Sequence, residues 1–279
     1  EAAAAVHLRY FGRVDVDGAE EKAHSDFVSR VDLEAQEAAL VVIRRRYPHH
    51  AVLAEEDEGG RTENREWPGD GTPLWIVDPL DGTTNYLHGH PQFGASVGVG
   101  QKVSAAAGEG EVDQSFLLEA GAVVAPRTGE RWWARRGQGA FKNGLRLRAS
   151  PLQGLRRALV GTGFPFKAPE LVPRYLQELG RVLPASGGVR RAGSAALDLC
   201  YVAEGIFDGF WEEAYLSPWD VAAGLVILRE AGGTATRLDG SAIDLANGSV
   251  LAAGTPALLR ELQDVVLGRE PGMGTGERT

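Results

Sequence analysis

The segment that most limits the possible folds runs from an apolar stretch into a group of turn residues. Leu74–Val77 is apolar, and Asp78, Pro79 and then Asp81 follow it, before a glycine and two threonines. A short apolar run predicts a buried strand, and because proline has no N–H to donate, we expect the strand to stop before Pro79. The glycine and the threonines predict a tight turn and a helix that begins near Thr83. The segment therefore predicts a strand that delivers two carboxylates to the N-terminus of a helix.

Two carboxylates at one strand end predict a cation site. Mg²⁺ takes oxygen ligands in octahedral geometry, and Asp78 and Asp81 together with a backbone carbonyl of the turn would supply part of that shell. The free amides of the following helix would favour a phosphate beside the metal. The alternative is structural, with Asp81-Gly82 as a surface turn and Asp78 as a helix cap.

Two further acidic positions follow the same logic. The apolar run Ala51–Ala54 predicts a strand that ends at Glu55, so this carboxylate is expected to join the first two, although a run such as Glu55–Glu58 is often solvated surface. Asp220 stands at the N-terminal end of the apolar helix expected over Asp220–Ala231, where an N-cap role alone would explain it.

Helix and strand patterns alternate along the chain. Apolar residues at helical spacing predict helices over Asp32–Tyr47 and Pro256–Leu267, and a shorter helix within Glu1–Arg13 with Val6, Leu8 and Phe11 near one side. Alternating residues punctuated by glycine predict antiparallel hairpins, and later strands alternate with helices. The pattern predicts a mixed α/β fold.

The chain shows no linker-like stretch and no internal repeat. We therefore expect a single domain over residues 1–267. The composition of residues 268–279, rich in Gly, Pro, Glu and Arg, predicts a disordered tail.

The composition excludes several functional classes. The 38 acidic residues outnumber the 29 basic ones, which gives a net charge of −9 and argues against a nucleic-acid partner. A single cysteine, Cys200, excludes an intramolecular disulfide and any multi-cysteine metal site. The sequence has no apolar run long enough to cross a membrane and no signal-peptide pattern at its start, so we expect a cytoplasmic protein without a membrane partner.

Several segments match, in order and spacing, the motifs of one family. They are Asp26–Asp32, Glu55-Glu56, Asp78–Thr83, Arg136–Gly144, Gly193–Ala196 and Trp219–Gly224. The chain resembles the inositol monophosphatases of the lithium-sensitive, Mg²⁺-dependent sugar-phosphatase superfamily over residues 20–265, and Asp78–Thr83 matches their Asp-Pro-Leu-Asp-Gly-Thr signature without gaps. The resemblance implies a layered αβαβα sandwich. Ser29 stands where the family usually has threonine, and residues 101–119 form a longer and more acidic connection than expected.

The resemblance also implies a set of metal ligands. Glu55, Asp78 and the Leu80 carbonyl would hold one Mg²⁺, and Asp78, Asp81 and Asp220 a second. A looser third ion near Glu55 is a family feature. The metal site would belong mainly to the N-terminal half, about residues 1–150, and the substrate site to the C-terminal half, about residues 151–267.

The resemblance assigns catalytic roles beside the metals. The amides of Gly82 and Thr83, next to Asp81, would bind the phosphate of the substrate. The Thr83 hydroxyl paired with Asp32 would help to activate the attacking water, with Glu55 close by.

The remaining family positions contact the rest of the substrate. Gly193, Ser194, Ala195 and Glu213 match positions that hold sugar or inositol hydroxyls, and Asp220 would also orient the water that protonates the leaving oxygen. A carboxylate at Glu213 favours a neutral polyol over a group with a second phosphate nearby. The implied activity is hydrolysis of inositol monophosphate, by a homodimer in which Mg²⁺ is the cofactor.

Other functions stay open at this point. Related enzymes act on histidinol phosphate, fructose 1,6-bisphosphate or 3′-phosphoadenosine phosphates with the same metal core. Ser96 lies in a G-x-S-x-G pattern, but the residues after it continue a strand where a nucleophile elbow needs a helix. The histidines, among them His88 and His90, show no H-E-x-x-H zinc motif. A non-catalytic metal-binding regulator would bind Mg²⁺ without releasing phosphate.

Overall fold

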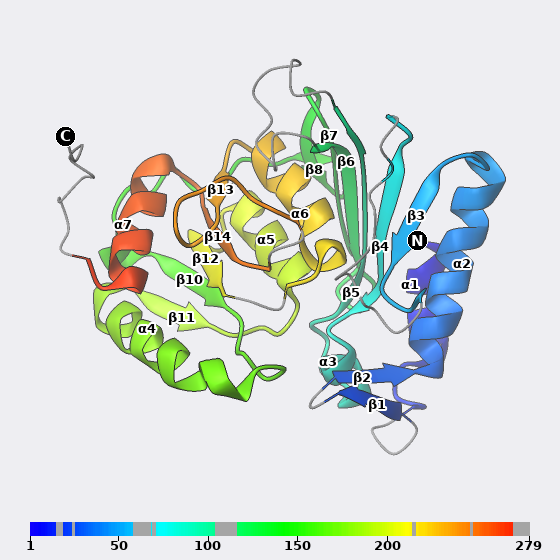
Figure 1. The fold of residues 1–279 in the computed structure, drawn as a ribbon, viewed down its shortest axis with the longest axis horizontal. Helices are drawn as coiled ribbons and strands as arrows, with labels where there is room; N and C mark the ends of the chain where they lie inside the picture. The colour runs from blue at the N-terminus through cyan, green and yellow to red at the C-terminus, as the bar shows by residue number, and fades with distance from the viewer. Residues whose placement is uncertain are drawn as a thin grey trace.

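The computed structural model describes residues 1–14, 19–23, 26–57, 68, 71–103, 116–213, 216–245 and 248–269. Helices and sheets alternate in five layers, as Figure 1 shows. The arrangement confirms the αβαβα sandwich.

A seven-stranded sheet forms one of the two β layers. In spatial order its strands are β3 (Ala51–Ala54), β4 (Leu74–Asp81), β5 (Gly94–Lys102), β6 (Phe116–Ala125), β7 (Glu130–Arg135), β8 (Gly139–Lys142) and β9 (Leu145–Arg146). β3 and β4 are parallel, and all later neighbours are antiparallel. The expected hairpins are therefore confirmed.

A five-stranded sheet forms the other β layer. In spatial order its strands are β11 (Gly188–Arg190), β10 (Leu159–Thr162), β12 (Gly209–Glu212), β14 (Val250–Ala253) and β13 (Thr234–Thr236). A separate two-stranded ribbon joins β1 (Ala19–Ala23) to β2 (Asp26–Ser29).

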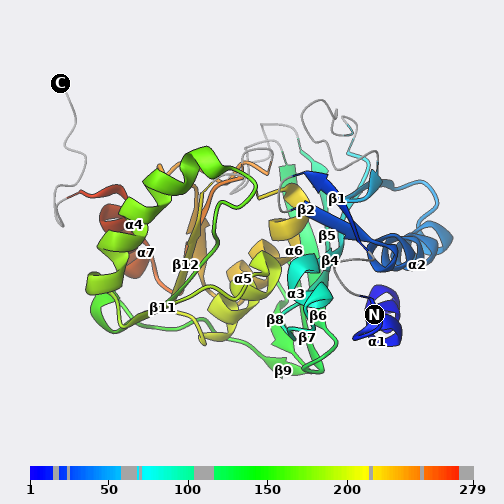
Figure 2. The same ribbon diagram turned by 90° about the horizontal axis from the view of Figure 1, so that it is seen from below.

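The helices complete the layers on both sides of the sheets. They are α1 (Ala2–Tyr10), α2 (Arg30–Arg46), α3 (Thr83–Leu87), α4 (Val172–Ala185), α5 (Ala195–Glu204), α6 (Pro218–Glu230) and α7 (Pro256–Leu267), with short 3-10 turns η4 (Leu155–Arg157) and η5 (Pro169–Leu171). α1 and α2 cover the outer face of the seven-stranded sheet, and α4 and α7 cover the outer face of the five-stranded sheet (Figures 1 and 2). α5 and α6 lie between the two sheets. None of the helices in the described ranges combines the length and apolarity that spanning a bilayer requires.

Small residues allow α6 to lie directly on the seven-stranded sheet. A Cβ atom added to Gly98 of β5 would lie 2.9 Å from the Cβ of Ala222, and one added to Gly121 of β6 would lie 2.6 Å from the carbonyl oxygen of Ala223. Real Cβ atoms do not approach so closely, so glycine is required at both positions. This contact fixes the position of the N-terminal end of α6, where Asp220 lies.

The N-terminal helix differs from its expected pattern. Val6 is buried, but Leu8 is 53% exposed and Phe11 lies beyond the end of α1. Phe11 nevertheless contributes to the core, because its ring packs against Tyr86 and Phe93. An aromatic residue after the helix end thus replaces the apolar stripe that the spacing predicted.

Two sequence-based expectations fall on residues that the structure does not describe. Of the connection at 101–119, β5 ends at Lys102 and β6 begins at Phe116, and residues 104–115 lie outside the described ranges. The tail expected to be disordered lies outside them from residue 270 onward.

Candidate metal centre

Strand β4 ends in a register break that projects two carboxylates. The strand continues past Pro79, contrary to the expectation that it would stop there, and Asp78 pairs with Ser96 while Asp81 pairs with Gly94. The proline falls inside the irregular part of the ladder, where its missing N–H removes no regular hydrogen bond. The Leu80 amide donates instead to Oδ1 of Asp78 at 2.9 Å.

The turn after β4 requires glycine. Gly82 has φ of 89°, and a Cβ atom there would lie 2.9 Å from the carbonyl oxygen of Gln92. The chain then enters α3 at Thr83, as the sequence predicted. Gly82 and Thr83 line the same cavity as the β4 carboxylates.

Three aspartates from two layers meet at this point. Asp78, Asp81 and Asp220 each offer a carboxylate oxygen, and these oxygens lie within 4.8 Å of one another. Asp220 is the third residue of α6, and Ser217, not Asp220, is the N-cap. The Ser217 amide donates to Oδ2 of Asp220 at 2.6 Å, which fixes the aspartate at the helix start.

Crowding of like charges makes the cluster suited to a divalent cation. Burial first, and then the charges of Glu55, Asp81 and Asp220, raise the pKa of Asp78 well above its usual range. Burial and Asp220 raise the pKa of Asp81 to about 7. Two like charges about 4 Å apart repel by roughly 4 kcal/mol at an effective dielectric constant of about 20. A hard cation removes this repulsion, and carboxylate oxygens are the ligands that Mg²⁺ prefers, so the donor set fits the metal.

Glu55 joins the cluster from the neighbouring strand. Because β3 and β4 are parallel, their carboxyl ends meet at the same edge of the sheet, and the Glu55 amide donates to the Val77 carbonyl at 3.1 Å. The charge of Glu55 raises the pKa of Asp78, and both residues line the same cavity. The structure thus brings together all four acidic residues that the sequence analysis selected.

The expected pair of Asp32 and Thr83 is also present. The Thr83 hydroxyl lies 2.9 Å from Oδ1 of Asp32 and 3.0 Å from the Leu80 carbonyl. Asp32 is fully buried, and its Oδ2 accepts hydrogen bonds from the amide and the hydroxyl of Ser29. Ser29, the residue that departs from the family threonine, is the N-cap of α2 and fixes Asp32 in place.

The start of α5 contacts Asp81 directly. Ser194 holds the N-cap position of α5, but its hydroxyl caps no amide. It donates instead to Oδ2 of Asp81 at 2.5 Å, and the Ala196 amide donates to the same oxygen at 2.8 Å. These two donors favour the ionised form of Asp81 and counteract part of the effect of burial.

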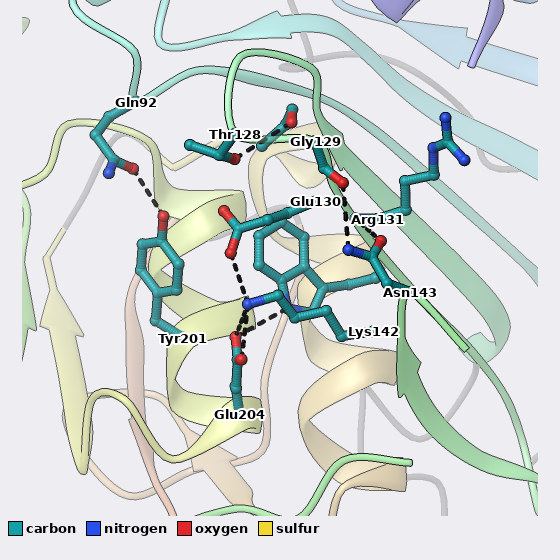
Figure 3. Close-up of polar contacts among 11 residues, drawn as sticks. Gln92, Thr128, Gly129, Glu130, Arg131, Lys142, Asn143, Tyr201 and Glu204 are labelled. Carbon is teal, nitrogen blue, oxygen red and sulfur yellow. Dashed lines mark hydrogen bonds and ion pairs between the residues drawn. The ribbon is translucent and has the colours of Figure 1, made fainter. Parts of the chain in front are cut away.

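A polar network holds the other end of α5. The Lys142 ammonium lies between Glu130 and Glu204, 2.6 and 2.7 Å from their carboxylates (Figure 3). The hydroxyl of Tyr201, one turn earlier in α5, donates to the Gln92 side chain at 2.9 Å (Figure 3). The C-terminal part of α5 is therefore held to β8 of the seven-stranded sheet and to the segment before β5.

The buried His7 forms a hydrogen bond to the turn at the end of β4. Its Nε2 lies 2.8 Å from the carbonyl oxygen of Pro79, the residue between two of the metal-ligand candidates. A carbonyl only accepts, so Nε2 carries the proton. Burial lowers the pKa of His7 to about 4, which keeps the ring neutral near pH 7. His7 could not be predicted from the sequence, because nothing in the pattern of α1 indicates a contact with residue 79.

A cavity of about 360 Å³ opens over the carboxylates. Its lining includes the predicted residues Glu55, Asp78, Leu80, Asp81, Gly82, Thr83, Gly193, Ser194, Ala195 and Asp220. A volume of this size is typical of small-molecule sites. Asp32 contributes through Thr83 and is not part of the lining.

Glu213, expected at the substrate site, lies outside this cavity, and its neighbour Glu212 lines it. Oε1 of Glu213 forms an ion pair with Nη2 of Arg174 at 2.6 Å, and Glu213 is absent from the cavity lining, which contains Glu212. Burial and the charge of Asp220 raise the pKa of Glu212 to about 8. Alternation along β12 could have identified it, since Phe210 packs between the sheets and Trp211 packs toward α4 and α7, so Glu212 shares the face of Phe210.

Further polar residues of the lining were also missed from sequence. Asp198 of α5 is buried, and its Oδ1 has no hydrogen-bond partner among the described residues. Lys167 and Arg191 add positive charge to the lining. The cavity thus has cationic side chains as well as the carboxylate cluster.

In the described part of the chain, the residues of the alternative catalytic hypotheses lack the geometry that those reactions require. Ser96 is fully buried within β5, and its hydroxyl donates to the Trp219 carbonyl at 3.2 Å, so it is not a nucleophile elbow. His88 and His90 are exposed. Cys200 is buried, and burial raises the pKa of its thiol far above the usual range, so it is not a reactive thiolate.

Comparisons with known proteins agree over the whole length of the fold. A family model described as the inositol monophosphatase family matches residues 1–267. The inositol-1-monophosphatase of Rhizobium meliloti is 41% identical over 259 residues, which cover 92% of this chain and 89% of that protein. The Nus factor SuhB of Pseudomonas aeruginosa is 39% identical over 262 residues, covering 92% of this chain and 90% of that protein. The crystal structure of the extragenic suppressor protein suhB from Bartonella henselae has a TM-score of 0.81 at 33% identity and covers 95% of this chain and 93% of that one.

Proposed function

Because this chain belongs to the inositol monophosphatase family, we propose that it is a Mg²⁺-dependent phosphomonoesterase that hydrolyses inositol monophosphate to inositol and phosphate. The observation that carries the proposal is the meeting of Asp78, Asp81 and Asp220 within 4.8 Å at the base of a cavity large enough for a phosphorylated polyol. Metal-dependent phosphatase chemistry is characteristic of this family. Inositol monophosphate as substrate, the choice of Mg²⁺ and two or three ions per site are our proposals.

The chain would hold the ions with residues of the carboxylate cluster. We assign Glu55, Asp78 and the Leu80 carbonyl to one site, and Asp78, Asp81 and Asp220 to the other. Mg²⁺ supplies positive charge that lowers the pKa of water and stabilises the charge that develops during displacement at phosphorus.

The residues around the metals would orient the reacting groups. Asp32 accepts a hydrogen bond from the Thr83 hydroxyl, which leaves a lone pair of the Thr83 oxygen to accept a hydrogen bond from the attacking water. Glu55 lies beside the same cavity and would take part in activating that water. The amides of Gly82 and Thr83 would donate to the phosphate, and Asp220 would orient the water that protonates the leaving oxygen.

The substrate hydroxyls would contact the opposite wall of the cavity. Gly193, Ser194 and Ala195 belong to the lining and would meet one edge of the polyol. We assign the carboxylate that accepts hydrogen bonds from its hydroxyls to Glu212 in place of Glu213, because only Glu212 lines the cavity. We also propose that residues 1–267 form a single catalytic domain and that the protein is a homodimer, which light scattering would test.

Phosphate release from a set of esters tests the proposed activity. Inositol 1-phosphate, histidinol phosphate, fructose 1,6-bisphosphate and 3′-phosphoadenosine 5′-phosphate would be compared with Mg²⁺, with and without lithium. We expect the highest kcat/KM with inositol 1-phosphate, inhibition by lithium, and loss of turnover in Asp78→Asn and Asp220→Asn. Ser96→Ala serves as control and should retain turnover, because the Ser96 hydroxyl donates to the Trp219 carbonyl and only the backbone of Ser96 pairs with Asp78. A faster reaction with another ester would reassign the substrate.

The relatives named Nus factor SuhB favour a second candidate, a regulatory protein that binds the metal without needing hydrolysis. Calorimetry with Mg²⁺ and the phosphate-release assay together separate the two. Metal binding without phosphate release from any of the esters would support the regulatory role, whereas release that depends on Asp78 supports the enzyme.

A further inference from the structure

A glycine at the end of strand β10 lies beside the carboxylate that lines the substrate wall. Strands β10 and β12 are parallel neighbours, and the last pair in their register is Thr162 with Trp211. Gly163 and Glu212 are the next residues on the two segments. Both line the cavity that contains the carboxylate cluster. Whatever stands at position 163 therefore lies directly beside the Glu212 side chain.

The space that a side chain at position 163 would need is filled by the Glu212 carboxyl group. A Cβ atom added to Gly163 would overlap the Cδ, Oε1 and Oε2 atoms of Glu212, and outside the adjoining residues these are the three heavy atoms nearest to it. Nonbonded heavy atoms attract best at about 3.5–4.0 Å and repel steeply at shorter distances. A side chain at position 163 and the carboxyl group in its present place therefore exclude each other.

The backbone at Gly163 would accept a side chain without strain. Gly82 and Gly193, which also line the cavity, both have φ of 89°, whereas Gly163 is not among the glycines with positive φ. The atoms that a Cβ atom would overlap form the end of a flexible side chain, which can adopt another rotamer. Glycine at position 163 is therefore required for the place of the Glu212 carboxyl group and not for the fold.

Polar contacts do not hold the Glu212 carboxylate in place. Within the described ranges, its oxygens take part in neither a hydrogen bond nor an ion pair. The charge of Asp220 acts on it repulsively, and the charges of Arg191 and Lys167 act on it attractively. Because these charges act without direct contact, the room left by Gly163 decides where the carboxylate lies.

This arrangement makes one small residue decisive for the substrate wall. We propose that Gly163 is a positioning residue that determines specificity for polyol phosphates, because its missing side chain leaves the recess in which the Glu212 carboxylate lies and faces the substrate hydroxyls. The inference rests on the proposed function and deepens it, since it names what keeps the hydroxyl-binding carboxylate in the cavity. With a larger residue at position 163, the site should still bind the phosphate but no longer recognise the hydroxyls.

The test compares an ester that has polyol hydroxyls with one that has none. Inositol 1-phosphate and p-nitrophenyl phosphate would be assayed with Mg²⁺ at pH 9, above the pKa of about 8 of Glu212. We expect Gly163→Ala to raise KM for inositol 1-phosphate about tenfold, with its kcat and both constants for p-nitrophenyl phosphate within about twofold of wild type. Gly180→Ala is the matched control and should equal the wild type, because Gly180 is exposed in α4 and an added Cβ atom meets no heavy atom within 4 Å outside its own helix backbone.

A double-mutant cycle separates positioning from direct contact with the substrate. Glu212→Ala removes the carboxyl group that the methyl group of Ala at position 163 would displace. Adding Gly163→Ala to Glu212→Ala should therefore change KM for inositol 1-phosphate less than twofold. A further rise of KM would show that the methyl group itself obstructs the substrate, and the proposal would be overturned.

A crystal structure of Gly163→Ala gives a readout that does not depend on turnover. We expect an unchanged fold in which the Glu212 carboxyl group has moved away from residue 163 into another rotamer. A carboxyl group in its present place, with the backbone at residue 163 displaced instead, would overturn the proposal.

The outcomes separate this inference from the proposed function. An unchanged KM for inositol 1-phosphate in Gly163→Ala, or an equal rise of KM for both esters, would overturn the role of Gly163 while phosphate release still supports the enzyme. If the wild type releases no phosphate from either ester, the proposed function fails, and the crystal structure alone then decides whether Gly163 positions Glu212.

Discussion

At the scale of single residues, two adjacent glutamates offer a controlled test of the substrate wall. Glu212 lines the cavity, whereas Glu213 is held by Arg174 outside it. At pH 9, above the pKa of about 8 of Glu212, we expect Glu212→Gln to raise KM for inositol 1-phosphate about tenfold and to lower kcat less, because an amide accepts hydrogen bonds from hydroxyls more weakly than a carboxylate.

The neighbouring substitution is the control for that experiment. Glu213→Gln should leave KM within about twofold of wild type in the same steady-state assay. A larger effect at Glu213 than at Glu212 would return the substrate role to the residue that the family resemblance indicated.

His7 allows a second test at the residue scale. His7→Phe keeps the ring packing against Tyr86 and Phe93 but leaves the buried Pro79 carbonyl without its donor, a loss of about 1–3 kcal/mol. Because this carbonyl belongs to the turn that carries Asp78 and Asp81, we expect activity to require several times more Mg²⁺. His7→Gln restores a donor and should recover most of the Mg²⁺ response.

Tyr86→Phe distinguishes positioning from a general loss of stability. The Tyr86 hydroxyl donates to the backbone carbonyl of His7 at 2.8 Å and does not contact the turn. Its removal should lower the urea midpoint without changing the Mg²⁺ concentration for half-maximal activity. A Mg²⁺ requirement that shifts equally in His7→Phe and Tyr86→Phe would contradict a specific role for His7.

At the scale of elements, α4 carries a pH-sensitive group. Glu178 is buried, and burial together with the charge of Glu213 raises its pKa to about 7, against the opposing effect of Arg174 on the same helix. An acid whose pKa is raised in the folded state contributes stability that is complete below the unfolded pKa, near 4.3, and is lost as the pH rises through about 7. Glu178→Gln does not titrate, so it should be more stable than wild type at pH 8 by on the order of 1–2 kcal/mol and closer to it at pH 5.

Urea unfolding at pH 5 and pH 8 measures this difference. Glu37→Gln, on the exposed side of α2, should show the same pH dependence as the wild type. Parallel pH profiles for Glu178→Gln and wild type would show that Glu178 ionises in the folded protein as it does in the unfolded chain.

Local patterns predicted most elements, and the differences arise where distant contacts override them. Pro256–Leu267 and Ala51–Ala54 match the predicted bounds, because capping and apolar periodicity act within a few residues. The extension of β4 past Pro79 depends on the register that β5 imposes, which no local pattern contains. Ser194 shows the same limit, since its hydroxyl contacts Asp81, 113 residues away in sequence, in preference to its own helix.

The site was predictable to the extent that its residues stand at element ends. Glu55 and Asp78 follow apolar runs, so the sequence alone placed them near a shared edge, whereas only the family resemblance joined Asp220 to them. The choice between Glu212 and Glu213 depends on where β12 ends, and boundaries are the least determined part of a sequence-based assignment. Residues such as His7 and Arg191 reach the site through tertiary contacts only.

At the scale of the whole molecule, the candidate site joins separate layers. Asp78 and Asp81 come from the seven-stranded sheet, Asp220 from the helix layer between the sheets and Glu212 from the five-stranded sheet. The layers therefore meet where like charges repel. Cation binding to this cluster should stabilise the complete fold and not only a local loop.

Chelation tests this coupling between metal and fold. Mg²⁺ at 100 times its dissociation constant should stabilise the wild type by about 2.7 kcal/mol relative to protein in EDTA, measured by urea unfolding. Asp78→Asn removes one of the crowded charges while the amide oxygen still accepts from the Leu80 N–H. In EDTA this variant should therefore be more stable than the wild type, because it lacks the Asp78 carboxylate, whose ionised form is disfavoured by burial and by the neighbouring charges.

The same substitution should abolish the stabilisation by Mg²⁺, so the order of stability reverses when the metal is added. KCl at equal ionic strength is the control, since general screening of charge would stabilise both proteins similarly. If Mg²⁺ stabilises Asp78→Asn as much as the wild type, the cation binds elsewhere on the acidic surface. If the variant is less stable than the wild type in EDTA, the hydrogen bond from the Leu80 amide to Asp78 stabilises the metal-free fold more than repulsion among the carboxylates destabilises it.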